Sequence, residues 1–190
     1  MRIPAILSLI LLASCAHPYH ISRGTLGRLT ASREPFVLVF GSLAATADTP
    51  GAPMLRFSHA ASKLGPEFPL MNLEIPHGGK FYAVLQPPKN LPHIDEFYVE
   101  VGNVEAGFDK IVYLRVRQTE GPQAMYLGEI TMSNAHGENI RGHMLKVNVR
   151  DDFQNASRDL RREYPRYSGP VGKGLAVRST PNSPAPPRVH

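Results

Sequence analysis

The sequence contains no tryptophan and only one cysteine, Cys15, among its 190 residues. A single cysteine excludes an internal disulfide, and in an exported protein it would stay an unpaired thiol unless it is modified. Residues 3–12 form an apolar run of ten positions, whereas a helix that stays in the bilayer needs about 20. This run therefore does not provide a permanent membrane span.

Motifs for phosphate and metal binding are also missing. Gly172, Lys173 and Gly174 lie in a glycine-rich stretch, but the pattern G-x-x-x-x-G-K-[ST] of a phosphate-binding loop is absent. The histidines show no helical i, i+4 pair, no H-x-H on a strand and no cysteine partner, which are the usual signs of a metal site. They are His17, His20, His59, His77, His93, His136, His143 and His190. We therefore expect no metal and no cofactor.

One pair of histidines and one pair of aspartates are weaker candidates for metal ligands. His136 and His143 flank a predicted hairpin loop that contains Glu138, and they are the nearest approach to a ligand set. Asp151 and Asp152 offer carboxylates of the kind that bind calcium, but capping of the following helix accounts for them with fewer assumptions. We expect loop and capping roles for these residues.

A hydrolytic triad can be drawn on paper in two ways. One combines Ser58 and His59 with Asp48, and the other combines Ser133 with His136. Neither serine lies in a nucleophile elbow, which is the sequence context that usually exposes a catalytic serine. We therefore predict no catalytic residues and expect that the protein is not an enzyme.

The charge balance is mildly basic. The chain has 21 lysines and arginines against 16 acidic residues, a net charge of +5 that falls to +4 without residues 1–14. The densest basic cluster, Arg158, Arg161 and Arg162, is interleaved with Asp159 and Glu163. A nucleic-acid-binding surface would show a basic stripe with aromatic residues in it. We predict no nucleic-acid partner, and we expect either a solvated mixed-charge surface or attraction to anionic lipid headgroups.

The N-terminus has the layout of a secretory signal. Arg2 precedes the apolar run, and the small residues Ala13 and Ser14 follow it. Leu12-Ala13-Ser14-Cys15 resembles the lipobox of bacterial lipoproteins, which implies cleavage after residue 14, a diacylglyceryl group on Cys15 and an acyl chain, such as palmitate, on its amino group. Together these chains would anchor the protein stably. The alternative is an ordinary signal peptide cleaved elsewhere, for instance near Ala16.

The residue after the lipidated cysteine bears on localisation. Ala16 stands where many lipoproteins kept in the inner membrane have aspartate. In a host with two membranes, the resemblance therefore implies the outer membrane, with the protein facing the periplasm.

The remainder predicts a mainly β domain. With 16 glycines and 18 prolines the chain favours turns and short strands. We expect a signal peptide at 1–14, a tether at 15–35, an antiparallel β-sandwich of about seven strands at 36–178, and a disordered proline-rich tail at 179–190. The expected strands lie at 36–40, 54–57, 68–75, 81–85, 96–101, 111–117, 125–132 and 143–149.

One helix is predicted at 152–164, at the C-terminal end of the domain. Asp151 is its expected N-cap, with Gln154 as the reciprocal partner. Phe153, Ala156, Leu160 and Tyr164 form an apolar stripe at spacings of three and four, and Pro165 ends the helix. The stripe predicts that the helix packs on the sheet.

A second resemblance joins three segments of the domain. They are Leu85-Gln86-Pro87-Pro88, the strand Met125 to Ile130, and the stretch from Val149 to Leu175 with its capped helix and Gly-Lys-Gly-Leu. Together they resemble a group of uncharacterised bacterial lipoproteins with a transthyretin-like or carboxypeptidase-regulatory-like β-sandwich. The resemblance implies a fold and a cell-envelope setting, and no activity.

Three function classes follow from these observations. The first is a non-catalytic envelope lipoprotein that docks a protein partner or supports an assembly. The second is a carbohydrate- or lipid-binding module, and its stacking candidates are Tyr82, Tyr98, Tyr113 and Tyr126. The third is a hydrolase with an unrecognised site. The sequence favours the first class, because Cys15 is the one residue to which it assigns a chemical role.

Overall fold

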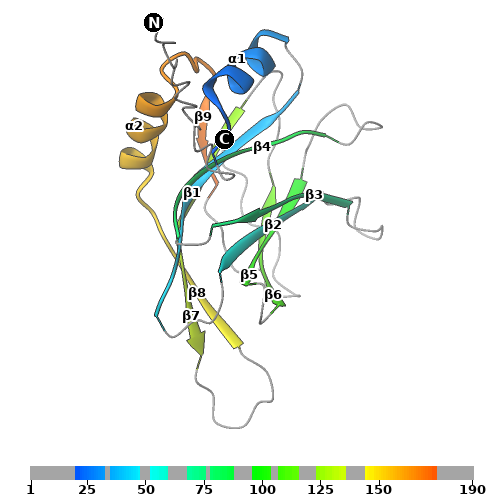
Figure 1. The fold of residues 1–190 in the computed structure, drawn as a ribbon, viewed down its shortest axis with the longest axis vertical. Helices are drawn as coiled ribbons and strands as arrows, with labels where there is room; N and C mark the ends of the chain where they lie inside the picture. Colours follow the sequence, from blue (N-terminus) through cyan, green and yellow to red (C-terminus); the bar gives the residue numbers. More distant parts are fainter. Residues whose placement is uncertain are drawn as a thin grey trace, which may run out of the picture.

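The computed structural model describes residues 20–32, 35–47, 52–59, 68–75, 78–87, 96–103, 107–115, 123–135 and 144–174. These residues form nine strands in two sheets, with two helices (Figure 1). The prediction of a mainly β chain is confirmed. Two finer expectations are wrong: one sheet is mixed rather than antiparallel, and there are two helices rather than one.

The first sheet has the order β4-β1-β7-β8, with β9 paired to β7. β1 runs antiparallel to β4 but parallel to β7, and β9 is also parallel to β7. Alternation of apolar residues sets which face of a strand is buried, but it does not encode strand direction, so the sequence pattern could not predict the parallel pairs. The strands are β1 (Val37–Ala45), β4 (Gly79–Leu85), β7 (Gln123–Ala135), β8 (Met144–Arg150) and β9 (Val171–Lys173).

The second sheet is antiparallel throughout. Its order is β3-β2-β5-β6, and each neighbouring pair is antiparallel. The strands are β2 (Pro53–His59), β3 (Phe68–Glu74), β5 (Glu96–Asn103) and β6 (Gly107–Arg115). Figure 1 shows these four strands to one side of the first sheet, with the ends of β7 and β8 extending below them.

β1 is the central strand of the first sheet and is covered on both faces. Val37 and Val39 belong to a hydrophobic cluster that both sheets share, together with Leu55 and Phe97 from the second sheet. The alternate residues Phe36, Leu38 and Phe40 belong to a different cluster on the opposite face. The continuous apolar run at 36–40 therefore has the physical meaning predicted for it, because both sets of side chains are buried.

A bulge interrupts the pairing of β1 with β7, where the register shifts between Phe40 and Ser42. Gly41 lies at this shift, and a Cβ atom there would stand 2.5 Å from the carbonyl oxygen of Gly128. Gly128 itself has a φ of 111°, which favours glycine. The two glycines thus permit a close approach of the two strands at the bulge.

Helix α2 (Phe153–Glu163) lies where the sequence predicts a helix. Leu160 and Tyr164 are buried, and Phe153 and Ala156 pack against the same cluster, so the predicted apolar stripe is confirmed. The start of the helix differs from the prediction, because Asp152 rather than Asp151 is the N-cap. Asp151 still contributes, since its Oδ1 accepts the backbone N–H of Phe153 at 3.1 Å.

Helix α1 (Arg23–Ser32) lies inside the segment predicted to be a tether. Its side chain Leu26 is only 3% exposed and packs in the cluster with Phe36 and Phe40. The hydroxyl oxygen of Ser22 accepts the backbone N–H of Thr25 at 3.0 Å and so caps the first turn. From His20 onward, these residues therefore belong to the folded domain. Cys15 and the predicted tail at 179–190 lie outside the described residues.

Candidate functional site

Both helices cover one face of the first sheet, which we call the helix-covered face. Figure 1 shows α1 and α2 beside the strands β1, β4 and β9. The hydrophobic cluster beneath them combines strand and helix residues, and its buried members are Leu26, Phe36, Leu38, Phe40, Tyr82, Ala124, Tyr126, Leu160, Tyr164 and Tyr167. Since the helices pack on this cluster, their polar side chains are held at defined positions above it.

The N-terminal end of the described chain, at His20 and Ile21, lies along β4 on this side of the domain. The backbone N–H of Ile21 donates to the carbonyl oxygen of Tyr82 at 2.8 Å, and His20 forms a parallel β-bridge with Tyr82. The His20 ring is hydrogen-bonded through Nε2 to the carbonyl oxygen of Lys80 at 2.8 Å. The hydroxyl of Tyr164 donates to the carbonyl oxygen of Ile21, also at 2.8 Å. The N-terminal segment is thus fastened to both β4 and the end of α2.

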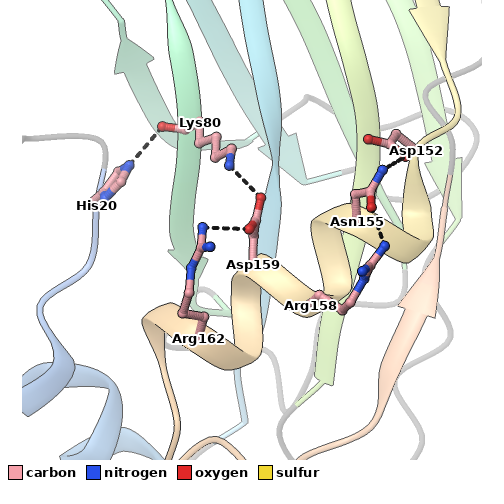
Figure 2. Close-up of polar contacts among 7 residues, drawn as sticks. All are labelled: His20, Lys80, Asp152, Asn155, Arg158, Asp159 and Arg162. Atoms are coloured by element: carbon pink, nitrogen blue, oxygen red, sulfur yellow. Dashed lines mark hydrogen bonds and ion pairs between the residues drawn. The ribbon is translucent and has the colours of Figure 1, made fainter.

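Polar side chains along α2 form a network above the sheet (Figure 2). Asp159 forms ion pairs with Lys80 of β4 and with Arg162 on its own helix, the latter at 2.7 Å. Nearer the start of the helix, the Asn155 amide donates to Asp152 Oδ1 at 2.7 Å, and Arg158 donates to the Asn155 oxygen. The Lys80–Asp159 pair is the charged link between α2 and the sheet in this view.

These ion pairs shift the pKa values of two carboxyl groups. The hydrogen bond from Lys80 lowers the pKa of Asp159, although partial burial works in the opposite direction. The hydrogen bond from Lys173 of β9 likewise lowers the pKa of Asp151. Both carboxylates therefore stay ionised at neutral pH. Asp159 then links α2 to β4, and Asp151, just before α2, links the start of the helix to β9.

A small cavity of about 150 Å³, the inner cavity, lies between α2 and the sheet. Tyr82 and Tyr126, two of the predicted stacking residues, line it. Both are buried, and their rings pack against Phe40, with centroids 6.4 and 5.5 Å away. Burial raises the pKa of Tyr82 to about 12, and the pKa of Tyr126 is also raised. These rings are core residues with little surface left for a sugar to stack on.

A larger cavity of about 390 Å³ lies between α1 and the chain that follows α2, and we call it the α1–α2 groove. Its volume falls within the roughly 300–1,000 Å³ of small-ligand sites. Its apolar wall comes from Leu26 and the rings of Tyr164 and Tyr167. The residues that line it are Arg23, Gly24, Leu26, Gly27, Thr30, Tyr164, Pro165, Arg166 and Tyr167.

The two arginines of the α1–α2 groove are in different states. Arg23 is engaged, because its Nε donates to the carbonyl oxygen of Glu163 at 2.6 Å and its Nη2 lies 3.3 Å from the Glu163 carboxylate. Arg166 is exposed, and within the described part of the chain it makes no hydrogen bond or ion pair. Arg166 is therefore the cation that the groove holds available for a ligand.

Charged neighbours of both signs act on the tyrosine wall of the groove. Burial raises the pKa of Tyr167, and the positive charge of Arg161 opposes this rise. Burial raises the pKa of Tyr164 as well, and the negative charge of Glu163 adds to this rise more strongly than the positive charge of Arg23 opposes it. The hydroxyl groups are not free for a ligand, since they donate to the carbonyl oxygens of Pro170 and Ile21. The wall is therefore closely packed, because Tyr164 and Tyr167 are only 3% and 5% exposed.

The described residues cover the catalytic combinations drawn from the sequence only in part. Ser58 is 5% exposed and lies within β2, where a serine has no access to a substrate from solvent. Asp48, Glu138, His136 and His143 lie outside the described residues. The backbones of Tyr98 and Tyr113 lie in β5 and β6, away from the helix-covered face. Among the described residues, no three His, Cys, Asp or Glu side chains are grouped as metal ligands.

Sequence reasoning missed the residues that build the α1–α2 groove. Arg23 and Arg166 are separated by most of the chain, and neither belongs to a recognisable motif. The available signal was weak: Leu26 and Leu29 are spaced as on one helical face, and Ser22 has cap chemistry. Only the packing of α1 beside Tyr164 brings the two arginines to one cavity.

In comparison with known proteins, no family model and no curated protein matches the chain. None of the helices in the described residues combines the length and the apolar composition needed to cross a membrane.

Proposed function

We propose that this protein is a lipid-anchored lipoprotein of the cell envelope, most simply of the outer membrane facing the periplasm, and that it acts as a non-catalytic docking or structural module. The observation that carries the proposal is the sequence Leu12-Ala13-Ser14-Cys15 at the end of a charged and apolar export segment. Lipidation also gives a role to the single cysteine, which would otherwise be an unpaired thiol in an exported protein.

The position of the folded domain relative to Cys15 supports this proposal. His20, the first described residue, is already fastened to β4. Five residues separate it from Cys15, and five extended residues reach at most about 18 Å. A lipid on Cys15 would therefore hold the domain close to the membrane surface, which suits a module that positions a partner there.

The fold that we propose for this module is a β-sandwich of the transthyretin-like or carboxypeptidase-regulatory-like kind. Support comes from the hydrophobic cluster to which both sheets contribute, for example through Val39 and Phe57. In the sandwich that we propose, β1 and β7 of the first sheet are parallel neighbours.

Binding of a lipid is the alternative that one observation favours, namely the α1–α2 groove with its available arginine, Arg166. The carbohydrate alternative has less support, because Tyr82 and Tyr126 are packed in the core. A hydrolase has the least, since Ser58 is buried within β2, and Ser133 lies within β7 with its hydroxyl donating to the carbonyl oxygen of Lys146.

Metabolic labelling with radioactive palmitate tests the anchor. In a bacterial host the full chain is expected to incorporate the label and to fractionate with membranes, whereas the Cys15→Ala chain incorporates none. The matched control is Ser14→Gly, a substitution at the adjacent position that keeps a small residue before the cysteine. This chain is expected to be labelled. Label in the Cys15→Ala chain, or none in either of the others, would refute the proposal.

A further inference from the structure

We infer that the α1–α2 groove binds the phosphate-bearing headgroup of an acidic phospholipid in the membrane that carries the anchor. The inference rests on the proposed lipid anchor at Cys15. It adds a ligand for the domain and an orientation of the domain on the membrane, which the anchor alone does not determine.

The first step is the distance between the anchor and the groove. Helix α1, which forms one wall of the groove, begins at Arg23, and the chain is fastened to the sheet from His20 onward. With at most about 18 Å of chain between Cys15 and His20, the wall formed by α1 stays near the headgroup layer. A headgroup in the same leaflet is therefore the ligand with the highest local concentration at this groove.

The second step is the chemistry inside the groove. A phospholipid headgroup carries an anionic phosphate beside short aliphatic carbons. The exposed guanidinium of Arg166 has no partner within the described part of the chain, and a guanidinium can bind phosphate through two parallel hydrogen bonds. Leu26, Tyr164 and Tyr167 line the cavity beside it, and because they are only 3–5% exposed, we assign the recognition of the phosphate to Arg166.

The third step is the charge of the surrounding surface. Residues 20–32 contain two basic and no acidic side chains, and residues 151–174 contain five basic and four acidic ones, a net charge of +3. Six of these seven basic groups are arginines of α1, α2 and the segment after α2. An anionic leaflet attracts such a surface by about 1 kcal/mol per basic residue close to it, which is about fivefold in binding.

Hydrogen exchange of the full chain on vesicles tests the inference. The protein is mixed with vesicles of phosphatidylcholine, with vesicles that also contain phosphatidylglycerol, or with soluble glycerol phosphate. We expect slower exchange in peptides from residues 20–32 and 161–168 only with phosphatidylglycerol vesicles. Equal protection by both kinds of vesicle, protection by soluble glycerol phosphate without vesicles, or no protection would each overturn the inference.

Two variants assign the effect to the groove. Arg166→Ala is expected to weaken the interaction with acidic vesicles by clearly more than the about fivefold that loss of any one basic residue near the membrane predicts. A Cβ atom at Gly27 meets no other atom within 4 Å, so Gly27→Phe places a ring toward the groove and is expected to reduce the protection. Arg158→Ala removes another exposed arginine, on α2, that does not line the groove, so it serves as the control and is expected to weaken the interaction by no more than about fivefold. Equal effects of Arg158→Ala and Arg166→Ala would contradict a groove-specific site.

The Cys15→Ala chain separates this inference from the proposed function. If the anchor is absent but the groove binds headgroups, this chain still shows protection that depends on phosphatidylglycerol and on Arg166, at a higher lipid concentration. If the anchor is present but the groove does not bind, palmitate labelling succeeds and the protection is missing.

Discussion

At the scale of single residues, the contact between Lys80 and Asp159 joins α2 to the edge strand β4. The Lys80 side chain is 53% exposed and the Asp159 side chain 21%, so water screens the pair and its contribution to stability is modest. The carboxyl pKa is nevertheless lowered, mainly by the hydrogen bond from Lys80. A lowered pKa in the folded state means that stability depends on pH through this group.

We predict that Lys80→Met lowers the free energy of unfolding at pH 7 by about 0.2–1 kcal/mol. Because the folded-state pKa of Asp159 is depressed, the contribution is present above the ordinary carboxyl pKa of about 3.9 and is lost as the pH falls through the folded value. The difference between the two proteins should therefore shrink between pH 5 and the acid limit of folding. Urea denaturation at a series of pH values measures it.

Lys146→Met is the matched control, because Lys146 is an exposed lysine of β8 for which the described residues provide no ion pair. It is expected to change the free energy of unfolding little at any pH. A Lys80→Met effect that grows toward acid pH would contradict the assigned role of Asp159.

At the scale of secondary-structure elements, the sequence predicts strands better than helices and strand pairs. Segments such as 36–40 and 96–101 carry apolar runs or strict alternation, and burial of Phe97, Val99 and Val101 confirms the face predicted for β5. Helix α1 was missed because its sequence, RGTLGRLTAS, contains two glycines and two threonines and so has low intrinsic helix propensity. The packing of Leu26 in the core stabilises the helix despite its low propensity. This tertiary contact cannot be read from the local sequence pattern.

The same reasoning explains why the candidate site was only partly predictable. Cys15, the anchor residue that we propose, follows from a local motif, which a sequence shows directly. Arg23 and Arg166 share a cavity only through the packing of α1 beside the end of α2, and β9 exists only because residues 171–173 find β7 as a neighbour. Short elements of this kind depend on tertiary contacts rather than on local sequence.

Substitution of Leu26 tests whether α1 belongs to the domain. We predict that Leu26→Ala lowers the free energy of unfolding by about 2–5 kcal/mol, since the side chain is 3% exposed and its removal leaves a cavity beside Phe36. Arg28→Ala, on the exposed side of the same helix, is the control and should change stability by less than about 0.5 kcal/mol. Chemical denaturation of the three proteins distinguishes a packed helix from a loose tether, for which both substitutions would be neutral.

At the scale of the whole molecule, the helix-covered face makes the first sheet dependent on the C-terminal part of the chain. Phe36, Leu38 and Phe40 of the central region are buried only because α2, α1 and the following segment lie over them. Without these elements a large aromatic surface would face water, which soluble domains rarely tolerate.

We therefore predict that a chain ending at Arg150, which lacks α2 and β9, binds a hydrophobic fluorescent dye and loses cooperative unfolding. A chain ending at Gly174 retains both elements and serves as the control, with little dye binding and a single unfolding transition. Cooperative unfolding of the shorter chain without dye binding would show that the sheets are stable by themselves.

The parallel pairing of β1 with β7 has a consequence for the time course of folding. Val37 lies beside Gln123, so the central strand lacks one neighbour until the ribosome has released about two thirds of the chain. Non-local strand pairing of this kind slows folding to the range of about milliseconds to seconds. A nascent chain that closes its central sheet slowly stays unfolded for longer, which suits the export that we propose, because an export channel for extended polypeptide admits only unfolded chains.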